Sequence, residues 1–215
     1  MNGSEPYVIT ISRMLGSGGM VIGKQLAEKL NIAYFDKEIL SSAAEVLGFQ
    51  EADLENYDEK TTPIWDLLLK SSAWENTDVY LEPRLSFPTN RQLYETEASI
   101  IKSIASERSA VIVGRGASFV LSDHPRHISI FLHCDADLRS KRIQDLSHIS
   151  EKDAIKMIKE SDSKRSHFQK QFTGRDWADV REYTLSFDTG KISLDCCIEI
   201  ISRYAQSRFG TTQIE

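Results

Sequence analysis

The chain is poor in the features that mark disulfide-rich, membrane-spanning and nucleic-acid-binding proteins. Its cysteines, Cys134, Cys196 and Cys197, are odd in number and two are adjacent, which argues against a disulfide framework and does not match zinc-site spacing. No apolar run approaches the roughly 18 residues of a membrane-spanning helix. Acidic residues outnumber basic ones by 32 to 26, so non-specific electrostatic binding to DNA or RNA is not expected.

No secretory signal is expected at the start of the sequence. The opening stretch, MNGSEPYVITISR, has no basic region leading into an apolar one, as a secretory signal would. Together with the unpaired cysteines, this predicts a reduced, cytoplasmic protein that has neither membrane nor nucleic acid as a partner. The 215 residues, 40% of them hydrophobic, suffice for one globular domain, and the sequence leaves the oligomeric state undetermined.

Short β-branched runs alternate with segments of helical periodicity along most of the chain. Strands are expected at 7–12, 32–35, 109–113, within 126–134, and at 183–187. Helices are expected at 20–31, 37–48, 91–107, 136–146, 150–172 and 193–209. This alternation is typical of βαβ units, which build a mainly parallel sheet whose ligands bind beyond the carboxyl ends of the strands.

A glycine-rich loop, GSGG at 16–19, lies between the first expected strand and the first expected helix. Glycines bring backbone amides close to one anion, and the following helix adds its positive amino-terminal end. These features favour a phosphate-binding loop over a simple turn. In the P-loop pattern G-x-x-x-x-G-K-[ST], however, Arg13 replaces the first glycine, Gly19 the lysine and Met20 the hydroxyl. Arg13 is the nearest cation available to replace the missing lysine.

The dinucleotide fingerprint G-x-G-x-x-G is a second interpretation of the same loop. Gly16 and Gly18 fit it, but Val21 stands at the third glycine position. Asp36 lies 20 residues after Gly16, which is where dinucleotide-binding folds place a ribose-binding acid. A dinucleotide-dependent oxidoreductase therefore stays open as one alternative function.

Further motifs follow the loop in order along the chain. They are Tyr34-Phe35-Asp36, Gly114-Arg115-Gly116, the stretch IFLHCDADLRSKR, the pair Asp162-x-x-Arg165, and the closing stretch YTLSFDTGKISLD. With this order, the chain resembles the bacterial cytidylate kinases and, more closely, the cytidylate-kinase-like proteins whose loop reads ISR-x-x-GSGG. The resemblance implies a three-layer α/β P-loop NTPase core of the nucleoside-monophosphate-kinase type, with a parallel sheet, a helical insert at about 41–108 and a lid at about 147–175.

The resemblance also implies an ATP-dependent phosphotransferase and assigns roles to its arginines, whose planar fork binds two phosphate oxygens. The expected ligands of the ATP phosphates are Gly16, Ser17, Gly18, Gly19, Arg139 and Arg142. The acceptor, a nucleoside monophosphate or another small phosphorylated molecule, is expected beside Asp36, Arg115 and Asp162. The expected catalytic residues are Arg13, Asp36, Arg115 and Arg165.

Several positions depart from the family pattern. Besides the loop lysine and hydroxyl, the acceptor-phosphate arginine is replaced by Ser42, the aspartate of Gly-Arg-Asp by Gly116, and a lid arginine by Ile158. Mg²⁺ is therefore expected, if at all, without its usual protein ligands. These losses keep another function open, a nucleotide- or phosphate-binding module without turnover that acts as a sensor or scaffold.

The candidate side chains also have purely structural interpretations. Asp36 can cap the helix that follows it. Arg139 and Arg142 are three residues apart, so they can form a solvated basic helix face, and Asp162 with Arg165 can form an exposed i,i+3 pair. The sequence alone does not separate these interpretations from the functional ones.

Overall fold

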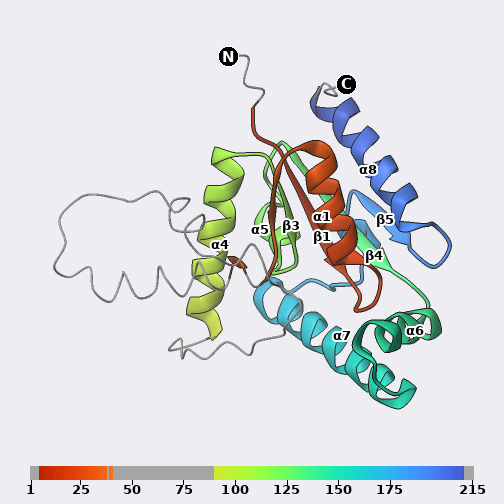
Figure 1. Ribbon diagram of the computed structural model, residues 1–215. Coiled ribbons are helices and arrows are strands. Elements are labelled where there is room, and N and C mark those ends of the chain that lie inside the picture. The colour runs from red at the N-terminus through yellow and green to blue at the C-terminus, as the bar shows by residue number, and fades with distance from the viewer. Residues whose placement is uncertain (1–4, 38, 41–89, 211–215) are drawn as a thin grey trace.

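The computed structural model describes residues 5–37, 39–40 and 90–210, which form an α/β fold around one parallel sheet (Figure 1). The order of the strands across this sheet is β2-β3-β1-β4-β5, and each neighbouring pair is parallel. Their bounds are β1 (Val8–Arg13), β2 (Ala33–Phe35), β3 (Ala110–Val113), β4 (His127–His133) and β5 (Leu185–Asp188). Because β1 is central, the loop that follows it leaves the middle of the sheet.

Helices cover both faces of the sheet. They are α1 (Gly19–Leu30), α4 (Asn90–Glu107), α5 (Ala117–Val120), α6 (Ala136–Ser147), α7 (Glu151–Thr173), the 3₁₀ turn η2 (Val180–Glu182) and α8 (Leu194–Phe209). The helices α1 and α8 pack on one face, and α4 and α5 on the other. The predicted three-layer α/β core with a parallel sheet is confirmed.

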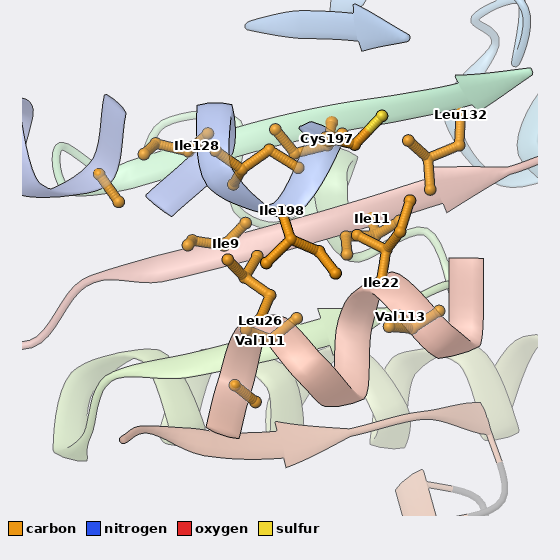
Figure 2. Packing of buried hydrophobic residues seen from close by; sticks show 14 of the residues in the cluster. Ile9, Ile11, Ile22, Leu26, Val111, Val113, Ile128, Leu132, Cys197 and Ile198 are labelled. Atoms are coloured by element: carbon orange, nitrogen blue, oxygen red, sulfur yellow. The ribbon is translucent and has the colours of Figure 1, made fainter. Parts of the chain in front are cut away.

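Alternation along the strands builds the two cores. On one face, Ile9 and Ile11 of β1 lie under Ile22 of α1 and Ile198 of α8, and all four are buried (Figure 2). On the other face, the buried side chains of β2 and β3 pack against the apolar side of α4. The main members of that second cluster are Phe35, Ile112, Ile100, Ile101 and Ile104. Both cores hold the strands in register beneath the loop.

The pair α6 and α7 lies at the carboxyl ends of the strands, at the bottom of the view in Figure 1. The side chain of Asp135 caps α6 and that of Ser150 caps α7, which anchors each helix start with a local hydrogen bond. Between the two helices, Ile158 packs with Ile143 and Ala154. The position of a family arginine is therefore occupied here by a buried apolar side chain.

The expected strands and helices appear within a few residues of their predicted positions. The elements that sequence patterns missed are α5 and η2, which are too short to show periodicity. Most of the helix expected at 37–48, most of the insert and Ser42 lie outside the described residues. The bounds of insert and lid stay predictions. In the described part of the chain, no helix combines the length and apolar character needed to cross a membrane.

Candidate functional site

The glycine loop runs from the end of β1 into the first turn of α1. Gly18 precedes α1 in a left-handed conformation with φ of 85°, and no side chain caps this helix. The amides of the first turn, from Gly19 onward, therefore lack helical partners and are available to an anion. Ser17 steadies the loop because its Oγ donates to the carbonyl oxygen of Met14 at 2.8 Å.

The side chain of Arg13 occupies the space that a side chain at residue 19 would need. A Cβ atom added to Gly19 would stand 2.6 Å from Arg13 Cγ, and one added to Gly114 would stand 2.0 Å from Arg13 Nη1. The stem of Arg13 thus crosses the start of α1, and its guanidinium lies against the end of β3. Both glycines are required by this path because real Cβ atoms essentially never approach another atom so closely.

The guanidinium of Arg13 has neither a hydrogen-bond nor an ion-pair partner in the part of the chain that the structure describes. Its pKa is lowered from 12.5 to about 10, chiefly by burial and then by the neighbouring charge of Arg165, while Tyr34 and Asp36 offset part of the shift. Desolvating a cation costs free energy, and the nearby carboxylate of Asp36 offsets only part of that cost. The loop therefore contains a desolvated cation with no hydrogen-bonded counter-ion among the described residues.

Arg139 and Arg142 of α6 hold the loop by its carbonyl oxygens. Arg139 Nη1 donates to Leu15 O at 3.2 Å, and Arg142 Nη1 donates to Gly16 O at 3.2 Å. Arg142 also donates to the hydroxyl and carbonyl oxygens of Thr189, at 3.1 and 2.8 Å. The interpretation of Arg139 and Arg142 as a solvated basic helix face is wrong, because the Arg139 side chain is only 8% exposed.

Asp162 joins α7 to the same loop. Its Oδ2 accepts from Arg139 Nη1 at 2.6 Å and its Oδ1 accepts from the amide of Leu15 at 2.9 Å. Arg165 lies 3.5 Å from Asp162 and donates from Nη1 to the carbonyl oxygen of Arg13 at 3.1 Å. Burial lowers the pKa of Arg165 despite the opposing charge of Asp162. The alternative interpretation of Asp162 and Arg165 as an exposed i,i+3 pair is wrong, because both belong to a largely buried network that ties α7 to the loop.

Asp36 follows β2 and is buried. Its Oδ1 accepts from the amide of Ile39 at 3.2 Å, and its carbonyl oxygen accepts from the amide of Leu40 at 3.0 Å. These bonds are those of a helix cap, so the structural interpretation of Asp36 is correct. Asp36 also interacts electrostatically with Arg13, which places it beside the loop cation.

The turn Gly114-Arg115-Gly116 follows β3 with three consecutive positive φ angles, 90°, 53° and 67°. Arg115 is thus held in the left-handed region, which is strained for a residue with a side chain and requires surrounding support. Part of that support is a 2.6 Å ion pair between Arg115 Nη2 and Oε1 of Glu97, a buried residue of α4. Burial lowers the pKa of Arg115 against the raising effect of Glu97.

A cavity of about 450 Å³ opens beside this pair, between α4 and α7. Its aromatic wall consists of Tyr94, Phe168 and Phe172, whose ring centroids lie 4.4 to 5.7 Å apart. The sequence reasoning missed these aromatics, Glu97 and Thr189. The i,i+4 spacing of Phe168 and Phe172 is a visible signal, but it equally fits a core face, and nothing in the sequence pairs them with Tyr94.

The donor set near the loop does not fit a protein-held magnesium ion. Met20, at the hydroxyl position, offers no oxygen ligand, and Gly116 has no side chain. No group of three His, Cys, Asp or Glu residues within the described ranges is placed to hold a metal ion. Because magnesium usually binds through one or two carboxylates together with substrate phosphates and water, a magnesium ion here would take most of its ligands from ATP and water.

A glycine loop between the central strand and the first helix, with arginines from three further segments around it, defines a P-loop kinase-like protein. The sequence matches the model of the cytidylate kinase-like family over residues 8–191, and the chain belongs to that family. The family membership expected from the motifs is confirmed. None of the curated proteins matches the sequence.

Solved structures agree with this assignment. An uncharacterized protein from Eubacterium ventriosum ATCC 27560 superposes with a TM-score of 0.70 at 27% identity, over 94% of this chain and 99% of its own. A gluconokinase from Sinorhizobium meliloti 1021 superposes with a TM-score of 0.50 at 14% identity, over 97% of this chain and 94% of its own. At such low identity, the gluconokinase supports the fold alone.

Proposed function

We propose that the protein is an ATP-dependent phosphotransferase in which Arg13 takes the role of the missing loop lysine. The observation that carries this proposal is the Arg13 guanidinium, which lies beside the uncapped start of α1 and which no described residue pairs or hydrogen-bonds. Phosphoryl transfer needs alignment of the reacting groups and positive charge on the transferred oxygens more than covalent chemistry. A cation held by a packed stem, next to free helix amides, supplies that charge without a lysine at residue 19.

The other candidate residues take roles around this centre. Gly16, Ser17, Gly18 and Gly19 would bind the ATP phosphates through their amides, and Arg165 would add charge from α7. Arg139 and Arg142 remain proposed phosphate ligands, but here both donate to loop carbonyls, so reaching a phosphate requires them to exchange partners. Asp162 holds the amide of Leu15 and one of these arginines, so its carboxylate has to move if Arg139 does.

The acceptor would bind in the cavity between α4 and α7. Arg115 at its edge fits an acceptor phosphate, the aromatic wall of Tyr94, Phe168 and Phe172 fits a planar ring, and Asp36 would orient an acceptor hydroxyl. A nucleoside monophosphate combines such a ring with such a phosphate. It is therefore the acceptor class that we propose to test first.

The proposal is tested by calorimetry of ATP binding, with and without magnesium, followed by transfer assays with a panel of nucleoside monophosphates. Loss of a charge-assisted bond in Arg13→Ala should weaken ATP binding about 10- to 100-fold. Lys24→Ala is the matched control, because Lys24 is an exposed cation on α1. Absence of ATP binding to the wild type, or equal weakening in both variants, refutes the role of Arg13.

A second candidate function is a nucleotide-binding module without turnover. The specific observation in its favour is the network of Asp162 with Arg139 and the Leu15 amide, which uses loop-facing groups for protein contacts. Single-turnover transfer of the labelled phosphoryl group from ATP separates the two functions. Transfer that is lost in Arg13→Ala excludes the inactive module. Tight ATP binding without transfer to any acceptor excludes the phosphotransferase.

A further inference from the structure

The central strand β1 and its neighbour β4 carry polar residues on one face, although interior strands of parallel sheets are normally apolar on both faces. In β1, Thr10 and Ser12 alternate with isoleucines, and in β4, His127 and Ser129 do the same. The isoleucines face α1 and α8. Thr10, His127 and Ser129 face the opposite side and are buried, between 0% and 8% exposed. Burying hydroxyls and an imidazole costs free energy unless they are hydrogen-bonded.

These polar groups form a connected network with the short helix α5. Thr10 Oγ1 hydrogen-bonds His127 Nε2 at 2.7 Å and Ser118 Oγ at 3.1 Å. Ser118 Oγ continues to Ser12 Oγ at 3.0 Å. Burial lowers the pKa of His127 to about 4, so its imidazole is neutral at physiological pH. The network therefore presents neutral groups that both donate and accept hydrogen bonds.

A cavity of about 320 Å³, here called the polar cavity, lies over this network. Its floor includes Ser118, His127 and Ser129, and arginines from three segments, Arg175, Arg181 and Arg208, line it as well. Only one carboxylate, Glu182, is among the described residues that line it. The lining is thus mostly polar and predominantly positive, with the ring of Phe119 as its main apolar member.

The three arginines differ in how they are paired. Arg175 pairs with Glu182 and stacks over a phenylalanine ring, and Arg181 pairs with Asp179 at 2.6 Å. Arg208, near the end of α8, has no ion-pair partner within the described ranges. It is therefore the cation of the polar cavity that is available to an anionic ligand.

We propose that the polar cavity is a second ligand site, which takes a small hydroxylated phosphate ester. The phosphate would pair with Arg208, and the hydroxyl groups would bond to the floor at Ser118 and Ser129, while His127 holds Thr10 beneath them. A cationic ligand is excluded by the arginines, and a purely apolar one by the hydroxyls and imidazole of the floor. The volume lies at the small end of the range for ligand pockets, roughly 300–1,000 Å³.

The polar cavity is separate from the candidate site at the glycine loop. His127 is the first residue of β4, and Thr184, which also lines the cavity, precedes β5, so the cavity lies toward the amino ends of these strands. The glycine loop follows the carboxyl end of β1. A ligand of the polar cavity consequently binds whether or not the proposed kinase activity exists.

The test uses glycerol 3-phosphate as the probe in calorimetric titrations of the full chain, with excess ATP present to fill the glycine loop. Inorganic phosphate and glycerol are titrated in parallel. The informative variant is Arg208→Ala, since Arg208 is exposed and its loss should leave the fold intact. The matched control is Arg203→Ala, another exposed arginine of α8 that pairs with Glu199 and does not line the polar cavity.

We expect glycerol 3-phosphate to bind, Arg208→Ala to weaken it about tenfold, and Arg203→Ala to leave it unchanged. Thr10→Val, which removes the hydroxyl that supports His127 and Ser118, should weaken the ester more than inorganic phosphate. The proposal is overturned by absence of binding, by equal effects of the two arginine variants, or by displacement of the probe by ATP. Inorganic phosphate that binds as tightly as the ester overturns the role of the hydroxyl floor.

Discussion

Arg13 and Gly19 should be energetically coupled, because the structure puts them in the same space. The perturbation is Gly19→Ala, which adds a Cβ at 2.6 Å from Arg13 Cγ and at 3.0 Å from Arg13 Cβ. Forcing a methyl group into packed surroundings costs about 1–3 kcal/mol. Alanine also favours a helix over glycine by up to about 1 kcal/mol, so the single substitution alone mixes two effects of opposite sign.

A double-mutant cycle removes this ambiguity. Urea unfolding is measured for the wild type, Gly19→Ala, Arg13→Ala and the double variant. The helix preference of alanine appears in both arms and cancels, whereas the steric conflict exists only when the Arg13 side chain is present. We therefore expect a coupling free energy of about 1–3 kcal/mol, with Gly19→Ala tolerated better in the Arg13→Ala background.

Gly190→Ala supplies the matched control for this cycle. Its added Cβ would meet Cys134 Sγ at 3.0 Å and Asp188 Oδ1 at 3.1 Å, and no atom of Arg13 is among its nearest neighbours. A cycle of Gly190→Ala with Arg13→Ala should be additive within about 0.5 kcal/mol. If the Arg13–Gly19 cycle is equally additive, the Arg13 stem does not cross the start of α1 and the reasoning about the lysine position fails.

Two further predictions concern titration and ion pairing. The pKa of His127 is about 4 in the folded chain and near 6.5 in the unfolded chain. As the pH falls, the unfolded chain therefore binds the proton first, which favours unfolding. Up to about 3 kcal/mol of the folding stability that is present above pH 6.5 should be lost by pH 4. Urea titrations across this range should show a weaker loss in His127→Gln, and an unchanged loss would contradict the assignment. In the same assay, Asp162→Asn should lower the free energy of unfolding by about 3 kcal/mol, because it leaves the buried Arg139 without its ion-pair partner. The control Glu160→Gln affects only an exposed pair with Lys156 at 3.9 Å and should lower it by less than about 1 kcal/mol. Similar costs for both would show that the Arg139 pair is no more than a surface contact.

Much of the fold was predictable because its signals are local. The hydrophobic run of β1, the cap at Ser193 before α8 and the glycine loop between β1 and α1 can each be recognised within about ten neighbouring residues. The order of these segments also identified the family. The short helix α5 was not predicted, because four residues are too few to show helical periodicity.

The candidate site was only partly predictable. Arg13 and Arg115 were found because they stand inside or beside glycine-rich turns. Glu97 was missed because it is one acidic residue among many on α4, and only its 2.6 Å pair with Arg115 distinguishes it. The surface interpretation of Asp162 could not be rejected from its spacing to Arg165, because the i,i+3 pattern says nothing about which loop lies against the helix.

The sequence by itself determined the alternating strands and helices, the glycine-rich loop between β1 and α1, and the absence of a lysine at residue 19 of that loop. These properties depend on backbone preferences and on neighbours in the chain. The tertiary structure alone decided where the Arg13 side chain lies, because its guanidinium runs against Gly114, in the turn that follows β3. It also decided that Thr10, Ser118 and His127 meet beneath the polar cavity, since hydrogen bonds between residues more than 100 positions apart exist only once the sheet has formed.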